Sequence, residues 1–536
     1  MLCLGYNTAK YIGFSIFIAY FRRKRVYSLS KKSDINSLYK PKIFDVLRTF
    51  SAEEFKEFGR FVRSEYFNRN KKAALLFEAI KDYYPLFTST QLEKERLFIK
   101  ISPKKFNDST MRNMFSALIR LAGQFIAIEK LKTNTAVWND NLLLGLMQRN
   151  LTSLTKIVLD KQEQELKSLN GVESGSFLNR YYHEINKYNF SILDGKVIKL
   201  KHVKAQLIKL RDSGVFITIH FIMELVSNQI NLFLTTGKFN VSDMSDLTEK
   251  ILQDFELEAA YKKLKNKTEY GFILALYIKL LRSFAHPENH KLFIDYRHCV
   301  DKYINRLGPD EISFHYSRII SYVTLKITQF PSNSQYLDEL FELHEIIINN
   351  GYYLNSKVTY IPASLYRNII QIALRSNQIG WLVKFMAKAP GLLAPQHSES
   401  MLNYGNALAA YETGKPDLAL DTMHKISLDN FIYKYDLYNL RIKIFFDKGN
   451  YETLVDTIHA YMIFIKNDPL QTKRRKDENR NFAKYIKRLA EFREGTGKID
   501  INFHRHKLDE NELVANKPWL EEKYEEVING RIAKAV

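Results

Sequence analysis

Cysteine, proline and glycine are all scarce in this chain. It contains 2 cysteines, 12 prolines and 21 glycines in 536 residues, whereas typical proteins have about 7% glycine and about 5% proline. The two cysteines, Cys3 and Cys299, are far apart and provide neither a disulfide framework nor a zinc motif. So few helix-breaking residues predict long helices with short connections. The lack of disulfides predicts a reducing, cytoplasmic location.

Local motifs for catalysis and for metal or cofactor binding are missing as well. No G-x-S-x-G sequence occurs, and the glycines at Gly495 and Gly497 fit a helix that stops after Glu494 better than a phosphate-binding loop. His286 and His290 flank a predicted turn, so they do not share a helix face as zinc ligands would. We therefore expect a protein that is not an enzyme and has no cofactor and no metal.

A dispersed active site leaves no local motif, so an enzyme remains a third functional class. Its sequence candidates are two pairs of titratable residues, His183 with Glu184 and His220 with Glu224. An enzyme would gather all four around one cleft, and we do not expect them to converge.

Residues 1–40 combine an apolar run, Tyr11–Phe21, with the basic run Arg22–Arg25 directly after it. The apolar run is too short to span a membrane, which takes about 20 residues, and its charge follows it instead of preceding it as in a secretory signal. Three interpretations remain: a membrane-surface anchor, a single span, or a non-native extension from an upstream start. We favour the extension, because globular patterning begins near Lys42. Membrane association through residues 1–25 is the alternative location.

Residues 41–135 are expected to form an N-terminal helical bundle. Ser51 and Glu54 have the spacing of a capping box at the start of an amphipathic helix. A second helix is expected to stop before Pro85, and a long helix follows over Thr110–Lys130. The aromatic residues recur at helical spacing, which indicates a core and not a base-stacking surface.

Residues 136–266 continue as a middle helical array with short polar breaks, one of them expected at Asp212–Gly214. The segment Gly214–Leu234 is apolar enough to raise the question of a membrane span. Its interspersed polar residues favour a buried helix instead.

From residue 267 to residue 470 the chain is expected to form successive helical hairpins. The turns of the last three hairpins carry Asn377, Gly414 and Gly449, which are 37 and then 35 residues apart. Glycine and asparagine suit turn positions with positive φ. A hairpin of this length cannot bury its apolar face alone, so the period predicts a solenoid with an extended groove for a partner.

These three hairpins resemble tetratricopeptide repeats, in which small and aromatic residues recur at fixed positions of both helices. The usual leading tryptophan is absent, and Asn403 takes its place in the middle repeat. The whole chain also resembles uncharacterised bacterial helical-repeat proteins, a likeness that implies no activity. The matching positions are Tyr366, Ala373, Asn377, Leu382, Met386 and Ala389; Ala407, Ala410, Gly414, Ala419, Met423 and Ile426; and Tyr438, Phe445, Gly449, Leu454, Ile458 and Tyr461.

The resemblance implies that first-helix residues form a concave binding surface. We therefore expect an all-α, elongated α-solenoid of helical hairpins with an N-terminal helical bundle. Its expected role is that of a non-catalytic scaffold or adaptor that binds a protein or peptide in the groove. The residues expected to bind the partner are Arg367, Gln371, Arg375, Tyr404, Tyr411, Asn439 and Lys443.

Positive charge supports an alternative partner, because Lys and Arg outnumber Asp and Glu by 80 to 59 and give a net charge of +21. Such a surplus attracts polyanions, so the alternative function is nucleic-acid binding by the basic surface. Residues 471–536 are expected to form a helical cap that closes the solenoid, beginning with a basic amphipathic helix over Gln471–Arg493. Its candidate polyanion contacts are Lys473, Arg474, Arg475, Lys476 and Arg480.

Overall fold

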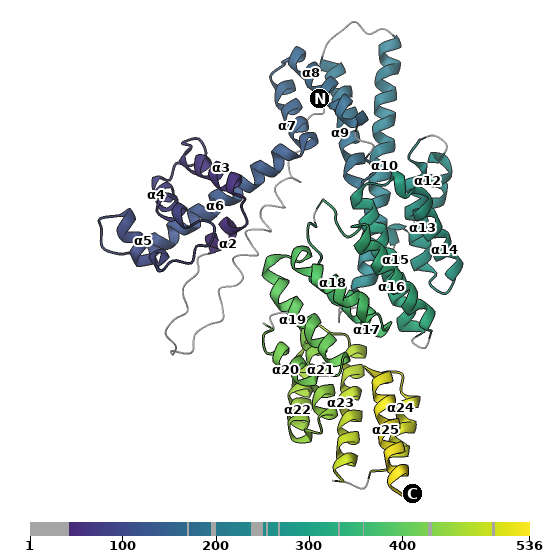
Figure 1. The fold of residues 1–536 in the computed structure, drawn as a ribbon. Helices are drawn as coiled ribbons and strands as arrows, with labels where there is room; N and C mark the ends of the chain where they lie inside the picture. Colours follow the sequence, from purple (N-terminus) through teal and green to yellow (C-terminus); the bar gives the residue numbers. More distant parts are fainter. Residues whose placement is uncertain are drawn as a thin grey trace. The chain divides into compact units, whose positions relative to one another are not determined.

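The computed structural model is all-helical across the residues that it describes (Figure 1). These residues contain two isolated β-bridges and no strand, so the predicted all-α class is confirmed. The chain divides into two compact units, Met1–Trp138 and Asn139–Val536. The segment 1–40, with its alternative interpretations, lies outside the described residues. The structure describes residues 42–168, 171–193, 200–236, 250–252, 256–265, 268–330, 333–356, 358–426, 431–495 and 499–535.

The first unit begins its helices much as the sequence predicts. The Ser51 hydroxyl accepts a hydrogen bond from the Glu54 amide (3.1 Å), and the Glu54 carboxylate accepts one from the Ser51 amide (2.7 Å), which confirms the capping box. The helix expected to end before Pro85 stops earlier and continues as a 3₁₀ turn. The elements are α2 (Lys42–Arg48), α3 (Ala52–Arg63), α4 (Lys71–Ile80), η1 (Lys81–Tyr83), η2 (Thr90–Leu92), α5 (Lys94–Ile101) and α6 (Asp108–Thr133).

Aromatic side chains form the core of the first unit. The Phe58 ring lies 5.5 Å from each of the rings of Phe50, Phe77 and Phe125. All four side chains are buried. Edge-to-face and tilted ring pairs at this separation stabilise a core beyond their buried area. This aromatic stripe is therefore packing, as its helical spacing indicated.

The second unit begins with long helices, of which α10 is the longest. It runs without interruption through the break expected at Asp212–Gly214, so that expectation was wrong. α10 packs against α9, and the residues that follow Gly214, beginning with Val215 and Phe216, pack in one apolar core. This tertiary packing outweighs the low helix propensity of a single glycine. The elements are α7 (Thr135–Gln148, which starts before the unit boundary), α8 (Thr152–Ser168), α9 (Ser174–Leu193), α10 (Leu200–Thr236) and α12 (Leu257–Leu264).

The apolar helix expected within Gly214–Leu234 is present, but only one of its faces is buried. Ile219, Met223 and Val226 are inaccessible, whereas Phe221 and Phe233 are exposed. Among the described helices, only α10 is long and apolar enough to cross a membrane, over Val203–Thr236, and 33% of its most apolar window is buried. The helix predicted to be buried is therefore buried on one face only.

Helical hairpins follow, each made of two helices that pack against one another. Figure 1 shows these pairs one after another from teal to yellow. A 3₁₀ turn, η3 (Ile304–Arg306), follows the second of these helices, and three further helices follow the last hairpin: α23 (Lys473–Glu494), α24 (Ile501–Glu510) and α25 (Lys517–Ala535). The hairpins are α13 (Gly271–Ala285) with α14 (His290–Tyr303), α15 (Pro309–Gln329) with α16 (Ser334–Asn349), α17 (Ala363–Arg375) with α18 (Ile379–Leu392), α19 (Pro395–Glu412) with α20 (Pro416–Met423), and α21 (Phe431–Asp447) with α22 (Tyr451–Asn467).

The three predicted turns have the same backbone geometry. Asn377, Gly414 and Gly449 adopt positive φ angles of 52°, 73° and 68°, as their residue types indicated. In each turn the next amide donates back into the last turn of the first helix, which is the hydrogen bond of a Schellman motif. These amides belong to Gln378, Lys415 and Asn450, and they donate to the carbonyls of Ala373 (2.7 Å), Ala410 (2.8 Å) and Phe445 (2.9 Å).

The positions that carry the repeat resemblance are buried or partly buried in the cores between helices, except Asn377, Gly414 and Gly449, which are exposed in the turns. Residues from α17 to α21 share one buried cluster, and residues from α21 to α25 share the next. Gly405 in α19 lies where these helices pack closely, because an added Cβ would lie 2.8 Å from the Met386 sulfur and 3.0 Å from Ile370. Each hairpin therefore buries its apolar face against its neighbours.

Candidate functional site

The seven residues expected to bind a partner lie on the first helices of three consecutive hairpins. We call their surface the first-helix face. Six of the seven make side-chain contacts that extend from α17 through α19 and α21 to the helices of the cap. The members on α17 are Arg367, Gln371 and Arg375; those on α19 are Tyr404 and Tyr411; those on α21 are Asn439 and Lys443.

Arg367 and Asp436 form the first part of this face. The guanidinium binds the carboxylate through two nitrogens, Nε to Oδ2 and Nη2 to Oδ1, the second at 2.7 Å. From the helix between them, the Tyr404 hydroxyl donates to the same carboxylate (2.9 Å) and accepts from the Gln371 amide (2.7 Å). Tyr404 is only 1% exposed. Burial and the neighbouring Asp436 charge raise the pKa of Tyr404, so its hydroxyl remains protonated.

Asn439 connects α21 to α23 through the side chain of Asn479. The Asn439 amide donates to the Asn479 side-chain oxygen (3.0 Å), which also accepts from the Tyr461 hydroxyl (2.7 Å). The side-chain oxygen of Asn439 is buried without a hydrogen-bond partner among the described residues. A buried amide oxygen without a partner gains a hydrogen bond from any donor group that reaches it.

Tyr411 and Lys443 form the part of the face nearest the cap. The Tyr411 hydroxyl donates to Asp447 (2.7 Å) and accepts from the indole nitrogen of Trp519 on α25 (2.9 Å). The Lys443 ammonium lies 5.4 Å from the centre of the Trp519 ring. Burial lowers the pKa of Lys443 to about 8, although the charges of Glu412, Asp447 and Glu522 oppose the shift.

Two cations on the face have no direct carboxylate partner. Arg375 is exposed at the end of α17, and it makes no ion pair or side-chain hydrogen bond with any described residue. Lys443 also makes no ion pair within 4.0 Å, whereas the nearby Lys523 is paired with Asp447 (3.4 Å) and Glu526 (2.8 Å). Arg375 is therefore an exposed cation of the face without a carboxylate partner, and Lys443 is a half-buried one.

Sequence reasoning missed four residues that complete the face. Asp436 and Asp447 had a detectable signal, because they continue the polar stripe of Asn439 and Lys443 at helical spacing along α21. Asn479 and Trp519 had none, since their contacts connect residues 40 and 108 positions apart.

The basic helix α23 begins at Lys473 and ends at Glu494, and its C-cap Gly495 has a φ of 71°, which confirms the predicted helix stop. Its predicted polyanion contacts differ in their surroundings. Arg474 pairs with Glu478 (3.0 Å), Arg480 pairs with Asp477, and the Arg475 guanidinium lies 5.9 Å from the Tyr435 ring. Lys473 and Lys476 make no ion pair with a described residue.

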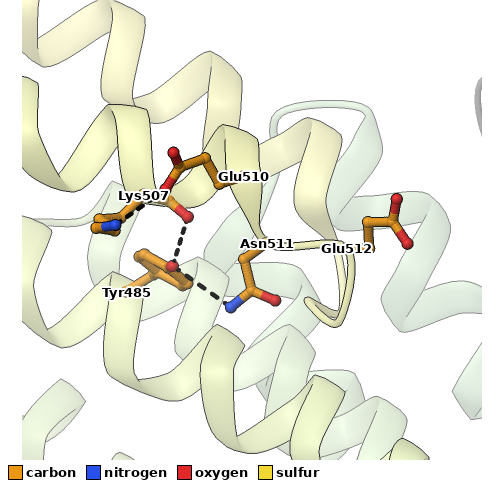
Figure 2. A pocket seen from close by; sticks show the side chains of 5 residues that line it. All are labelled: Tyr485, Lys507, Glu510, Asn511 and Glu512. Carbon is orange, nitrogen blue, oxygen red and sulfur yellow. Dashed lines mark hydrogen bonds and ion pairs between the residues drawn. The ribbon is translucent and has the colours of Figure 1, made fainter.

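A small polar hollow of about 450 Å³ lies between α23 and the end of α24. Figure 2 shows the Tyr485 hydroxyl between two partners: it donates to the Lys507 carbonyl (2.9 Å) and accepts from Asn511 (3.4 Å). Lys507 also pairs with Glu510 (3.0 Å) and lowers its pKa. These groups bind one another, and the hollow offers no nucleophile with an adjacent base.

The dispersed enzyme candidates form two separate pairs of contacts. His183 is buried against Gln162 (3.0 Å), and burial lowers its pKa to about 4. His220 contacts Ser174 at the start of α9. Ser174 is nine residues from His183 in the same helix, which corresponds to about 13 Å along the helix axis. The Ser174 hydroxyl donates to Glu224 (2.6 Å), and the Nδ1 of His220 lies 3.0 Å from the Ser174 carbonyl, which can only accept a hydrogen bond. That nitrogen is therefore a donor and not a base for Ser174.

The described residues contain no group of three or more His, Cys, Asp or Glu side chains that could hold a metal ion. His286 lies 3.5 Å from Glu288, and His290 packs against the Phe293 and Tyr322 rings. No family model, curated protein or solved structure matches the chain.

Proposed function

We propose that the hairpins form a degenerate tetratricopeptide-like solenoid that binds a protein or peptide partner on its first-helix face, as a non-catalytic cytoplasmic scaffold or adaptor. The observation that carries the proposal is the pair of Arg367 and Asp436. These residues belong to the first and third of three consecutive hairpins and meet across the middle one.

Helix geometry explains why this pair supports a concave surface. Neighbouring packed helices lie about 8–10 Å apart, so a flat row would separate α17 and α21 by about 16–20 Å. An arginine and an aspartate side chain meet over that distance only if the row bends toward their face. A face that bends inward in successive hairpins is the groove that repeat proteins use for binding.

The residues of the face divide into a framework and a set of docking groups. Arg367, Gln371 and Tyr404 bind one another or Asp436, so they hold the helices in register before a partner arrives. Arg375 and Lys443 remain without a carboxylate partner. A preorganised surface with unpaired cations lowers the cost of binding an anionic partner. We therefore propose a partner segment that carries acidic side chains or a terminal carboxylate.

A charge reversal tests this proposal. Arg375→Glu is expected to reduce recovery of the partner in affinity capture of the full chain followed by mass spectrometry. The matched control is Lys388→Glu on α18, an exposed lysine on a second helix that is outside the first-helix face. Equal recovery with both variants would contradict binding on this face.

Nucleic-acid binding through α23 is the second candidate, and it has less support. Arg474 and Arg480 are paired with carboxylates of their own helix. Lys473, Arg475 and Lys476 make no ion pair with a described residue, and Arg475 lies over the Tyr435 ring. A polyanion must compete with those carboxylates for the two arginines.

A further inference from the structure

A second surface, in the first unit, combines unpaired positive charge with exposed aromatic rings. It is a hollow of about 900 Å³ between the α3–α4 loop and the middle of α6. We call it the loop hollow. None of its lining residues is acidic, and Glu65 of the same loop is not among them. The lining residues are Tyr66, Phe67, Asn68, Arg69, Asn70, Lys71, Lys72, Arg120, Leu121 and Gln124.

The cations of the loop hollow differ from most others in this unit. Arg69, Lys71, Lys72 and Arg120 are all exposed, and none makes an ion pair with a described residue. Eight other cations of the unit have a carboxylate partner, whereas this hollow brings together four that have none among the described residues. The paired ones are Arg48, Arg60, Arg63, Lys81, Lys94, Arg96, Arg112 and Lys132.

The aromatic rings are held in place by the loop. Asn68 donates to the Val62 carbonyl (2.7 Å) and accepts from the Asn70 amide (2.8 Å), which fixes the loop backbone. Phe67 stacks on the core residue Phe61 at 4.4 Å, and the Tyr66 ring meets Phe67 edge-on at 5.0 Å. Tyr66 is nevertheless 86% exposed. A large ring fixed by its neighbour and open to solvent offers a flat face to a ligand.

We propose that the loop hollow binds single-stranded nucleic acid, with a base stacked on Tyr66 and the phosphates bound by Arg69, Lys71, Lys72 and Arg120. Separate cations around an aromatic face match a strand that carries both phosphates and unstacked bases. A duplex keeps its base faces stacked and cannot use Tyr66. An isolated phosphate needs neither an exposed ring nor four cations. This inference goes beyond the proposed function and concerns the other unit.

Titration of the full chain with a fluorescein-labelled single-stranded RNA of about 12 nucleotides tests the inference, read by fluorescence anisotropy at about 50 to 200 mM salt. Lys71→Gln with Lys72→Gln is expected to weaken binding and to reduce the slope of log affinity against log salt by about 1.4, because each lost phosphate contact removes about 0.7. The matched control is Lys104→Gln with Lys105→Gln, two exposed lysines of the same unit that do not line the hollow.

Substitutions of Tyr66 distinguish the contribution of base stacking from that of phosphate binding. Tyr66→Leu is expected to weaken binding by on the order of tenfold without changing the salt slope, and Tyr66→Trp is expected to preserve binding. A control double variant that weakens binding as much as the Lys71 and Lys72 variant would overturn the inference. The inference would also be overturned if another polyanion competed as well as the single strand and its competition did not change in the Tyr66 variants. The polyanions to be compared are duplex RNA, polyphosphate, a phosphopeptide and phosphatidylserine vesicles. Circular dichroism of each variant verifies that it is folded.

Discussion

Arg367 on α17 holds Asp436 on α21 through two nitrogens, although 69 residues and the whole α19–α20 hairpin separate them. Tyr404 of that middle hairpin donates to the same carboxylate. The three hairpins are therefore connected on one face by a single carboxylate. Its loss should affect the whole row and not one pair of helices.

Removing either partner of this pair is expected to lower the free energy of unfolding by about 3 kcal/mol, because it leaves the other charge half-buried and uncompensated. Arg367→Met and Asp436→Leu are the single variants, and the double variant should cost clearly less than their sum. Urea unfolding measures all four proteins of the cycle. Additive losses would show that the two side chains do not interact.

Gly414 sets the turn between α19 and α20 with a φ of 73°. Gly414→Ala is expected to lower the stability of the chain by about 1 kcal/mol, because a side chain disfavours the left-handed conformation. Gly391→Ala in α18 is the control, since its φ is not positive and an added Cβ meets nothing within 4 Å. Thermal unfolding should separate the two variants, and equal effects would contradict the turn geometry.

His183 is expected to make stability depend on pH. Burial and the nearby Lys187 charge lower its pKa to about 4 in the folded chain, whereas the unfolded histidine titrates near about 6.5. Between these values the unfolded state binds more protons, so stability falls as the pH falls from about 6.5 to about 4. From pH 7 to pH 5 wild type should lose about 2 kcal/mol more than His183→Gln. Parallel losses in urea unfolding at the two pH values would refute this.

Lys443 is expected to make stability depend on pH in the alkaline range. Its folded pKa is lowered to about 8, and the unfolded lysine titrates near about 10.4. The unfolded state binds more protons between these values, so the penalty is full below about pH 8 and disappears as the pH rises through about 10.4. Lys443→Met should therefore be more stable than wild type at pH 7, by about 2 kcal/mol after allowance for partial exposure, and no more stable at high pH.

A spectroscopic titration checks the same lysine without unfolding the chain. Nuclear magnetic resonance of reductively ¹³C-methylated protein should show one lysine signal that titrates near pH 8 and is absent from Lys443→Met. A set of lysines that all titrate above pH 10 would contradict the burial of this ammonium.

Local sequence signals predicted local structure well. The capping box of Ser51 and Glu54 and the positive φ of Gly414 and Gly449 are consequences of neighbouring residues, so their spacing was sufficient. The prediction of a break at Asp212–Gly214 was wrong because it considered only neighbouring residues. Packing along α10 is a long-range effect that outweighed a local preference.

The candidate sites could be predicted only in part for the same reason. The resemblance to a repeat family led to residues of the first-helix face, but nothing local indicated that Arg367 would meet Asp436 or that Tyr411 would meet Trp519. The loop hollow was not anticipated either. Three of its cations lie close together in the sequence, Arg69 in the α3–α4 loop and Lys71 and Lys72 at the start of α4, but nothing local indicated that Arg120 of α6 lines the same hollow.

Site-specific photo-cross-linking tests the central claim, that a protein partner binds the first-helix face, most directly. A benzophenone side chain at position 375, in place of Arg375, should cross-link a partner in cells, whereas the same group at position 388 on α18 should not. Lys443→Glu in the same chain should reduce the cross-link, because it reverses a docking charge. Cross-links of equal yield from positions 375 and 388, or a yield at 375 that Lys443→Glu leaves unchanged, would contradict the account.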